Sequence, residues 1–190
     1  MTARVGYRVI ERFDQGSQGS DPWNGYLAWS QLFPLEEVVG LDTCLCPTVL
    51  DGDLDEDEPH LAFPWHLRAC FDDLSYALRR AKGFDEKRHQ VLAVARELSA
   101  VEVAECELPG FRFLGFDLIE EPTEISALTN CGGFEGALSA TDLSPFGLVP
   151  TAARAYTIRR RLAELFPDED HACCAVWALW RREVGDTPHG

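Results

Sequence analysis

The feature that most limits the fold is the run Phe111–Glu120, in which apolar side chains fall on both sides of the chain. In an extended strand Phe111 and Phe113 lie on one face, and Leu114, Phe116 and Leu118 lie on the other. A strand with two apolar faces is buried on both. The run therefore predicts a strand that is covered on both sides.

The sequence after this run predicts a hairpin. Glu121-Pro122-Thr123 is typical of a turn, so residues 124–131 are expected to return as a partner strand. Three further strands are expected over residues 4–13, 38–46 and 173–182, where apolar residues alternate along the chain. In the first of these, Tyr7 and Val9 are predicted to face the core and Arg8 the other side.

Four helices are predicted between the strands. Asp21 and Pro22 indicate the start of a short helix that ends near residue 32. Residues 65–81 have apolar side chains at spacings of three and four, and residues 85–106 are rich in Ala, Glu, Arg and Leu. The alternative for the end of the latter segment is an extended stretch over residues 101–108. Thr151 is expected to cap a helix that ends near residue 166. Its inner stripe is predicted to be Ala155, Ile158, Leu162 and Leu165.

This order of elements favours an α+β fold over a doubly wound parallel fold, which would need strands and helices to alternate throughout. We expect one domain over residues 1–184, with a mostly antiparallel or mixed sheet of about five strands and about four helices packed on it. Residues 185–190 are expected to form a flexible tail.

The charge of the chain limits its partners. With 32 acidic against 17 basic residues, the formal net charge is -15 and the isoelectric point is near 4.6. Such a chain repels nucleic acid and anionic membranes, so we expect neither as a partner and favour a basic protein. The first ten residues have no apolar run of signal-peptide length, and the seven cysteines are odd in number. We therefore expect a cytoplasmic protein with reduced thiols.

An acidic loop is the first candidate site. It consists of Asp51, Asp53, Asp55, Glu56, Asp57 and Glu58. Alternating carboxylates resemble the start of an EF-hand loop, but Glu56 replaces the glycine at the sixth position and Ala62 the carboxylate at the twelfth. The remaining interpretations are a solvated loop, a patch that docks onto a basic partner, and a non-standard cation site.

Cysteine and histidine give a second candidate. Cys44 and Cys46 would share a strand face, as would His171 and Cys173 on the last strand. If these strands were neighbours, the four side chains could bind zinc. The spacing of two residues between cysteines is not that of a zinc knuckle, so buried hydrophobic cysteine is the alternative, and we expect no metal or cofactor.

A cysteine nucleophile is a third candidate. Cys131 precedes Gly132-Gly133 at the predicted end of a strand, where glycine N–H groups could support a thiolate. His66 or His171 would be the base. The alternative is a strand that turns on two glycines. The sequence contains no Walker, GxSxG or HExxH motif that would indicate another catalytic class.

Aromatic residues give the last candidate. Trp23, Tyr26 and Trp29 are three residues apart and would share one face of the first helix. That face either belongs to the core or forms an exposed patch for a partner.

Together these properties favour a non-enzymatic acidic binding protein that neutralises or regulates a basic protein partner. The acidic loop would steer association, and Trp23 and Trp29 would anchor the partner. In general character the chain is similar to small bacterial proteins such as toxin-neutralising immunity proteins. The alternatives are a thiol-dependent hydrolase or transferase that uses Cys131, and a zinc-bound structural module.

Overall fold

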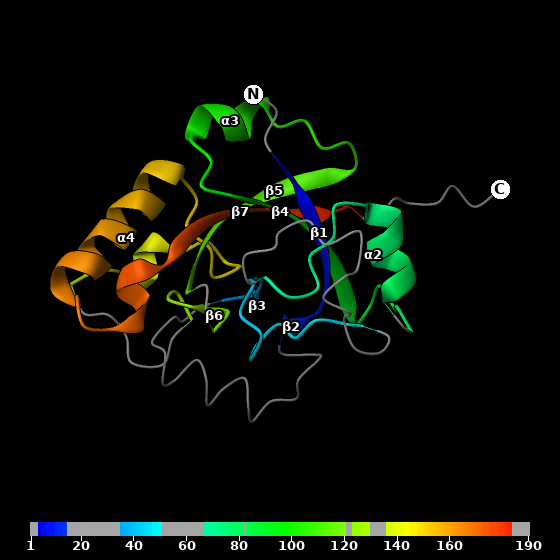
Figure 1. Cartoon of the computed structure of the whole chain (residues 1–190), viewed down its shortest axis with the longest axis horizontal. Helices are drawn as coiled ribbons and strands as arrows, with labels where there is room; N and C mark the ends of the chain where they lie inside the picture. The colour runs from blue at the N-terminus through cyan, green and yellow to red at the C-terminus, as the bar shows by residue number, and fades with distance from the viewer. Residues whose placement is uncertain are drawn as a thin grey trace.

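The computed structural model describes residues 4–14, 35–50, 67–81, 83–120, 123–129 and 136–183. Their main feature is a five-stranded antiparallel sheet with strand order β1-β4-β7-β5-β6, which curls into a half-barrel (Figure 1). The strands are β1 Gly6–Glu11, β4 His89–Arg96, β5 Phe111–Glu120, β6 Ile125–Ser126 and β7 Ala175–Arg182. A separate two-stranded ribbon pairs β2 (Phe13–Asp14) with β3 (Glu37–Val38). The predicted α+β class is confirmed.

The described residues contain three α-helices and two short 3-10 helices. They are α2 Leu74–Arg80, α3 Ala100–Glu105, α4 Ala152–Leu165, η1 Ala140–Asp142 and η2 Asp170–Cys173. In Figure 1, α4 lies at one side of the sheet, α2 at the opposite side and α3 at the top. About four helices were expected, and the one expected over residues 21–32 lies outside the described residues.

Helix α4 agrees with its prediction except in its last turn. The Thr151 side chain accepts a hydrogen bond from the Arg154 N–H and caps the first turn. Ala155, Ile158 and Leu162 are fully buried against the sheet, but Leu165 is 52% exposed. The apolar stripe ends one turn early because Phe166, just past the helix, packs against the same cluster.

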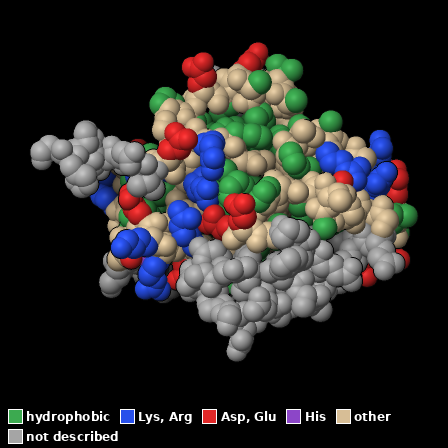
Figure 2. All heavy atoms as spheres, turned by 180° about the vertical axis from the view of Figure 1, so that it is seen from behind, with side chains coloured by type: hydrophobic (Ala, Val, Ile, Leu, Met, Phe, Trp, Pro, Cys, Tyr) green, Lys and Arg blue, Asp and Glu red, His purple; other side chains and the backbone are tan. Residues whose placement is uncertain are grey.

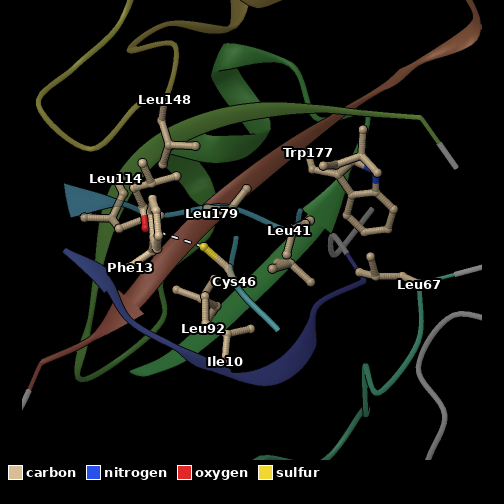
Figure 3. Close-up of a cluster of buried hydrophobic side chains, with 14 of the residues drawn as sticks. Ile10, Phe13, Leu41, Cys46, Leu67, Leu92, Leu114, Leu148, Trp177 and Leu179 are labelled. Atoms are coloured by element: carbon tan, nitrogen blue, oxygen red, sulfur yellow. Dashed lines mark hydrogen bonds between the residues drawn. The ribbon is translucent and has the colours of Figure 1, made fainter. Parts of the chain in front are cut away.

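Both faces of the sheet are covered, as the pattern of β5 predicted. The predicted division of its side chains is wrong, because the bulge between Phe113 and Gly115 interrupts the alternation: Phe113 lies on the same face as Phe116, and Leu114 lies on the other. One face, with Phe116 and Ala178, packs under α4. The other face carries Leu92 and Leu179 and packs against residues of the segment 35–46 and against Leu148 (Figure 3). Strand β5 therefore lies inside two hydrophobic layers, because each of its sides contributes to a different core cluster.

The predicted helix over residues 85–106 is wrong. Residues His89–Arg96 form β4, which pairs with β1 on one side and β7 on the other, and only Ala100–Glu105 is helical. Alanine, leucine and arginine favour a helix locally. However, the side chains from His89 to Ala95 are all buried, so packing between two strands overrides that preference.

Two other segments are less regular than predicted. The strand expected over residues 38–46 is wrong beyond Val38, because the Asp42 side chain accepts hydrogen bonds from the N–H groups of Cys44 and Leu45 and bends the chain into a turn. The helix expected over residues 65–81 begins only at Leu74. Before it, Phe71 exchanges two backbone hydrogen bonds with Tyr7 of β1.

The hairpin after β5 is confirmed but short. Ile119 pairs with Ser126 and Glu120 with Ile125, so β6 has two residues in place of the predicted eight. Strand β5 also contains a bulge between Phe113 and Gly115. Gly115 has φ +149°, and a Cβ there would lie 2.9 Å from both Leu148 Cβ and the Val149 carbonyl oxygen. The glycine therefore lets residues 148–149 approach the strand closely.

Candidate functional site

Most residues of the predicted sites lie outside the described ranges. They are the acidic loop, the two tryptophans expected to anchor a partner, the candidate nucleophile and one of its two candidate bases. In that order the residues are Asp51, Asp53, Asp55, Glu56, Asp57, Glu58, Trp23, Trp29, Cys131 and His66. Their roles remain predictions. The described residues include the four candidate zinc ligands and the second histidine.

The predicted strand positions of the candidate zinc ligands are wrong. Cys44 is exposed on the turn after β3, whereas Cys46 is buried and its thiol donates a hydrogen bond to the Val38 carbonyl oxygen at 3.5 Å. Figure 3 shows the Cys46 side chain inside the hydrophobic cluster. His171 and Cys173 lie in η2 before β7 begins, so they share no strand face. Within the described ranges no three His, Cys, Asp or Glu side chains are grouped so that they could hold a metal ion.

His171 is buried beside a carboxylate. Its Nδ1 lies 3.6 Å from Oε2 of Glu120, at the end of β5, and the two side chains are 9% and 5% exposed. A carboxylate in this position could orient the imidazole of a catalytic histidine. The proposed pairing of His171 with Cys131 is not tested, because Cys131 lies outside the described residues.

The structure brings together buried polar residues that the sequence analysis did not select. Asp42 and Asp117 are 3% and 1% exposed, and Ser126 and Thr129 lie against them. Asp42 Oδ2 accepts hydrogen bonds from the Ser126 N–H at 3.1 Å and from the Thr129 hydroxyl at 2.9 Å. The other oxygen of Asp42 accepts from the turn of residues 44–45, so both of its oxygens have partners.

Asp117 is the centre of this group. Its Oδ1 accepts hydrogen bonds from the Ser126 hydroxyl at 2.5 Å and the Leu118 N–H at 2.9 Å, and its Oδ2 accepts from the Leu41 N–H at 2.9 Å. The pKa of Asp117 is raised to about 6. Burial is the largest cause, the nearby Asp42 acts in the same direction, and the hydrogen bonds from Ser126 and Leu41 oppose the shift. Gly40 is close enough that a Cβ there would lie 2.9 Å from Asp117 Oδ2.

A buried ion pair lies next to this group. The Arg8 guanidinium is fully buried and donates to Glu124 Oε2 at 2.9 Å and to the Leu41 carbonyl oxygen at 3.3 Å. Glu124 also accepts a hydrogen bond from the Arg68 N–H. Arg8 was expected on the less buried face of β1. It is buried because the segment 35–46 covers that face of the sheet as well.

These contacts give the buried polar group a structural role. The carboxylates of Asp42, Asp117 and Glu124 hold two turns, residues 41–45 and 124–129, against β1 and β5. A general acid or base needs access to substrate, and these three side chains are almost fully buried and hydrogen-bonded. One sequence signal for the group was present, since an Asp inside the two-sided apolar run of β5 has to find buried partners.

The buried thiols of Cys46, Cys70 and Cys174 have low reactivity near neutral pH. Burial raises the pKa of Cys70 and of Cys174 to about 12, and it raises that of Cys46 as well. Since the thiolate is the reactive form, these three thiols are poor nucleophiles near neutral pH.

Comparison with known proteins does not assign the chain to a group. No family model matches it, and neither a curated protein nor a solved structure matches. Within the described ranges no helix combines the length and the apolar character that crossing a bilayer requires.

The exposed charges are the remaining feature that bears on function. Several arginines at the surface form ion pairs with carboxylates of the same chain, among them Arg154 with Asp142 and Arg159 with Glu97. Two stretches that are mostly exposed are acidic and contain no Lys or Arg: residues 99–110, with α3, and residues 163–170, which include Asp168, Glu169 and Asp170. Figure 2 shows acidic side chains at the top of the molecule, where α3 lies, above a group of hydrophobic side chains.

Proposed function

We propose that the chain is a non-catalytic binding protein whose partner is a basic protein. The observation that carries the proposal is the pattern of exposed carboxylates. Glu105, Glu107, Asp168, Glu169 and Asp170 are exposed, and no ion pair within the described part of the chain neutralises them.

The total charge supports the same conclusion. At -15 the chain creates a negative potential that attracts a cationic protein and speeds its association. The acidic loop of residues 51–58 adds six carboxylates to this field. The buried polar residues, by contrast, hold the fold together, and the described buried thiols have raised pKa values, so neither group favours catalysis.

The test is capture of the partner by the tagged chain, followed by native mass spectrometry and measurement of association rates. We expect one basic polypeptide at fixed stoichiometry, released by high salt. A variant with Asp53→Asn, Asp55→Asn and Asp57→Asn tests the loop. The matched control, Asp168→Asn, Glu169→Gln and Asp170→Asn, removes the same charge elsewhere.

The two variants separate steering by the loop from the effect of total charge. If the loop steers the partner, the loop variant associates about tenfold more slowly and the control changes less. Equal slowing by both variants assigns steering to the total charge. A captured partner that is acidic, or association that does not depend on salt, contradicts the proposed function.

A further inference from the structure

Residues 39–46, which we call the strap, cross one face of the sheet without forming a helix or a strand. Leu41 and Cys46 of the strap are fully buried, and they lie in the hydrophobic cluster with Leu92 of β4 and Leu179 of β7 (Figure 3). The strap has no ladder of backbone hydrogen bonds with the sheet. It therefore depends on a few individual contacts, and a segment of this kind can open while the sheet stays folded.

Two neighbouring buried carboxyl groups hold the strap in place. The Leu41 N–H donates a hydrogen bond to Asp117 Oδ2 at 2.9 Å. Asp42, in the strap itself, accepts hydrogen bonds from the Ser126 N–H and the Thr129 hydroxyl. The Ser126 hydroxyl in turn donates to Asp117 Oδ1. Ser126 thus joins Asp42 to Asp117, and the two carboxyl groups lie close together.

The interior around Asp117 has an excess of acidic groups. Its titratable groups in the described ranges are three carboxyl groups, one guanidinium and three thiols: Asp42, Asp117, Glu124, Arg8, Cys46, Cys70 and Cys174. Burial raises the pKa of each thiol, so the thiols are neutral. Arg8 is the only buried Lys or Arg of the described residues, and it is paired with Glu124. Negative charges on both Asp42 and Asp117 would therefore lack a buried counter-charge, which is costly.

Hydrogen bonding determines which carboxyl group carries a proton. Asp42 accepts four hydrogen bonds, two on each oxygen, so it has no acceptor position left for a proton. Asp117 Oδ2 accepts one hydrogen bond within the described part of the chain, from Leu41, and has room for a proton. Protonation of Asp117 therefore relieves the excess of acid. Its pKa is raised to about 6, with burial as the largest cause, in agreement with this assignment.

We propose that the strap is a pH-sensitive element that stays closed when Asp117 is protonated and opens more readily when Asp117 is ionised. Ionisation adds a second negative charge beside Asp42, and opening of the strap admits water to both groups. Opening also uncovers Leu41 and Cys46. The strap thus couples the acidity of the surroundings to exposure of part of the core, whatever partner the chain binds.

The test is hydrogen exchange of backbone amides, measured by NMR on the full chain between about pH 5 and about pH 8 and corrected for the intrinsic rate at each pH. The amides of Leu41 and Thr43 report on the strap, because they donate to Asp117 and to the Glu124 carbonyl oxygen. The amides of β4 and β7 report on the sheet. The variants are Asp117→Asn and Ser126→Ala, and Asp168→Asn is the matched control at an exposed position.

We expect protection of the strap amides to fall about tenfold from about pH 5 to about pH 8. This factor follows from a pKa that is 3.8 when Asp117 is in water and about 6 when the strap is closed. Low urea concentrations should speed exchange in β4 and β7 but change that of the strap little, since local opening exposes little surface. Asp117→Asn should abolish the pH dependence, and Asp168→Asn should retain it.

Three outcomes overturn the proposal. If strap and sheet amides respond equally to urea, the strap does not open separately. If the pH dependence persists in Asp117→Asn, another group controls it. If Asp117→Asn does not fold, NMR titration of the Asp117 carboxyl carbon in the original chain takes its place. A midpoint below about pH 5 then overturns the proposal. A midpoint near the pH where strap protection levels off, which moves upward in Ser126→Ala, supports it.

Discussion

The buried carboxylate of Asp117 predicts an unusual dependence of stability on pH. In the unfolded chain this group has its ordinary pKa of 3.8, whereas in the folded protein burial raises the pKa to about 6. Between these two pH values the folded state binds more protons than the unfolded state, so the free energy of unfolding falls as pH rises. The contribution of Asp117 is fully present below about pH 4 and is lost by about pH 6.

The magnitude follows from the size of the shift. A change from 3.8 to about 6 corresponds to about 3 kcal/mol at 25 °C. Asp117→Asn removes the titrating group. The unfolding free energy of the original chain minus that of the variant is therefore expected to be about 2–3 kcal/mol larger at about pH 4 than at about pH 7. Taking this difference cancels the contributions of other carboxylates, such as Asp142, whose pKa is lowered by its hydrogen bond from Arg154.

The assay is urea unfolding of the original chain and of Asp117→Asn at constant ionic strength, between about pH 4 and about pH 8. Tryptophan fluorescence monitors the unfolding transition. Ser126→Ala provides a further control, because it removes a hydrogen bond that lowers the pKa of Asp117. In that variant the fall in stability should extend to higher pH. A difference between Asp117→Asn and the original chain that stays constant over the whole range would refute the reasoning.

Three other perturbations test the packing of the fold. Arg8→Met leaves Glu124 buried without its ion pair and should lower the unfolding free energy by about 3–5 kcal/mol in urea titrations. Gly115→Ala places a methyl group 2.9 Å from neighbouring atoms and should cost about 1–3 kcal/mol, measured in the same way. Iodoacetamide near neutral pH should modify exposed Cys44 well before buried Cys46, whose pKa is raised by burial, as mass spectrometry of peptides would show.

Each of these predictions has a control in the same chain. Adding Glu124→Gln to Arg8→Met should recover part of the lost stability, because the uncompensated buried charge is removed. Gly110 also has a positive φ, of +75°, but no atom lies within 4 Å of a Cβ there, so Gly110→Ala should cost less than Gly115→Ala. Equal losses at the two glycines, or equal alkylation of the two cysteines, would contradict the packing argument.

Local sequence patterns were sufficient for the elements whose own residues decide their structure. The two-sided apolar run predicted β5 with its observed bounds, because a strand buried on both faces leaves that pattern directly in the sequence. Thr151 and the stripe below it predicted α4, and the alternation near the C-terminus predicted β7. The α+β class follows from these elements and the short hairpin after β5.

The sequence alone did not determine the elements that depend on distant partners. Strand β4 has the composition of a helix, and it is extended because β1 and β7 provide hydrogen bonds on both sides. The turn at Asp42 depends on Ser126 and Thr129, which are more than eighty residues away along the chain. Pairings at such separations leave no short-range pattern in the sequence.

For the function, the sequence by itself determined the surplus of negative charge and hence the class of partner that we propose. The tertiary structure alone decided where polar groups are used internally and where they remain at the surface. Arg8 and Asp117 form an ion pair and hydrogen bonds inside the fold. Both side chains are buried because both faces of the sheet are covered, and a buried charged group is stable only with such partners. The carboxylates of α3 stay exposed, because that helix buries none of its residues.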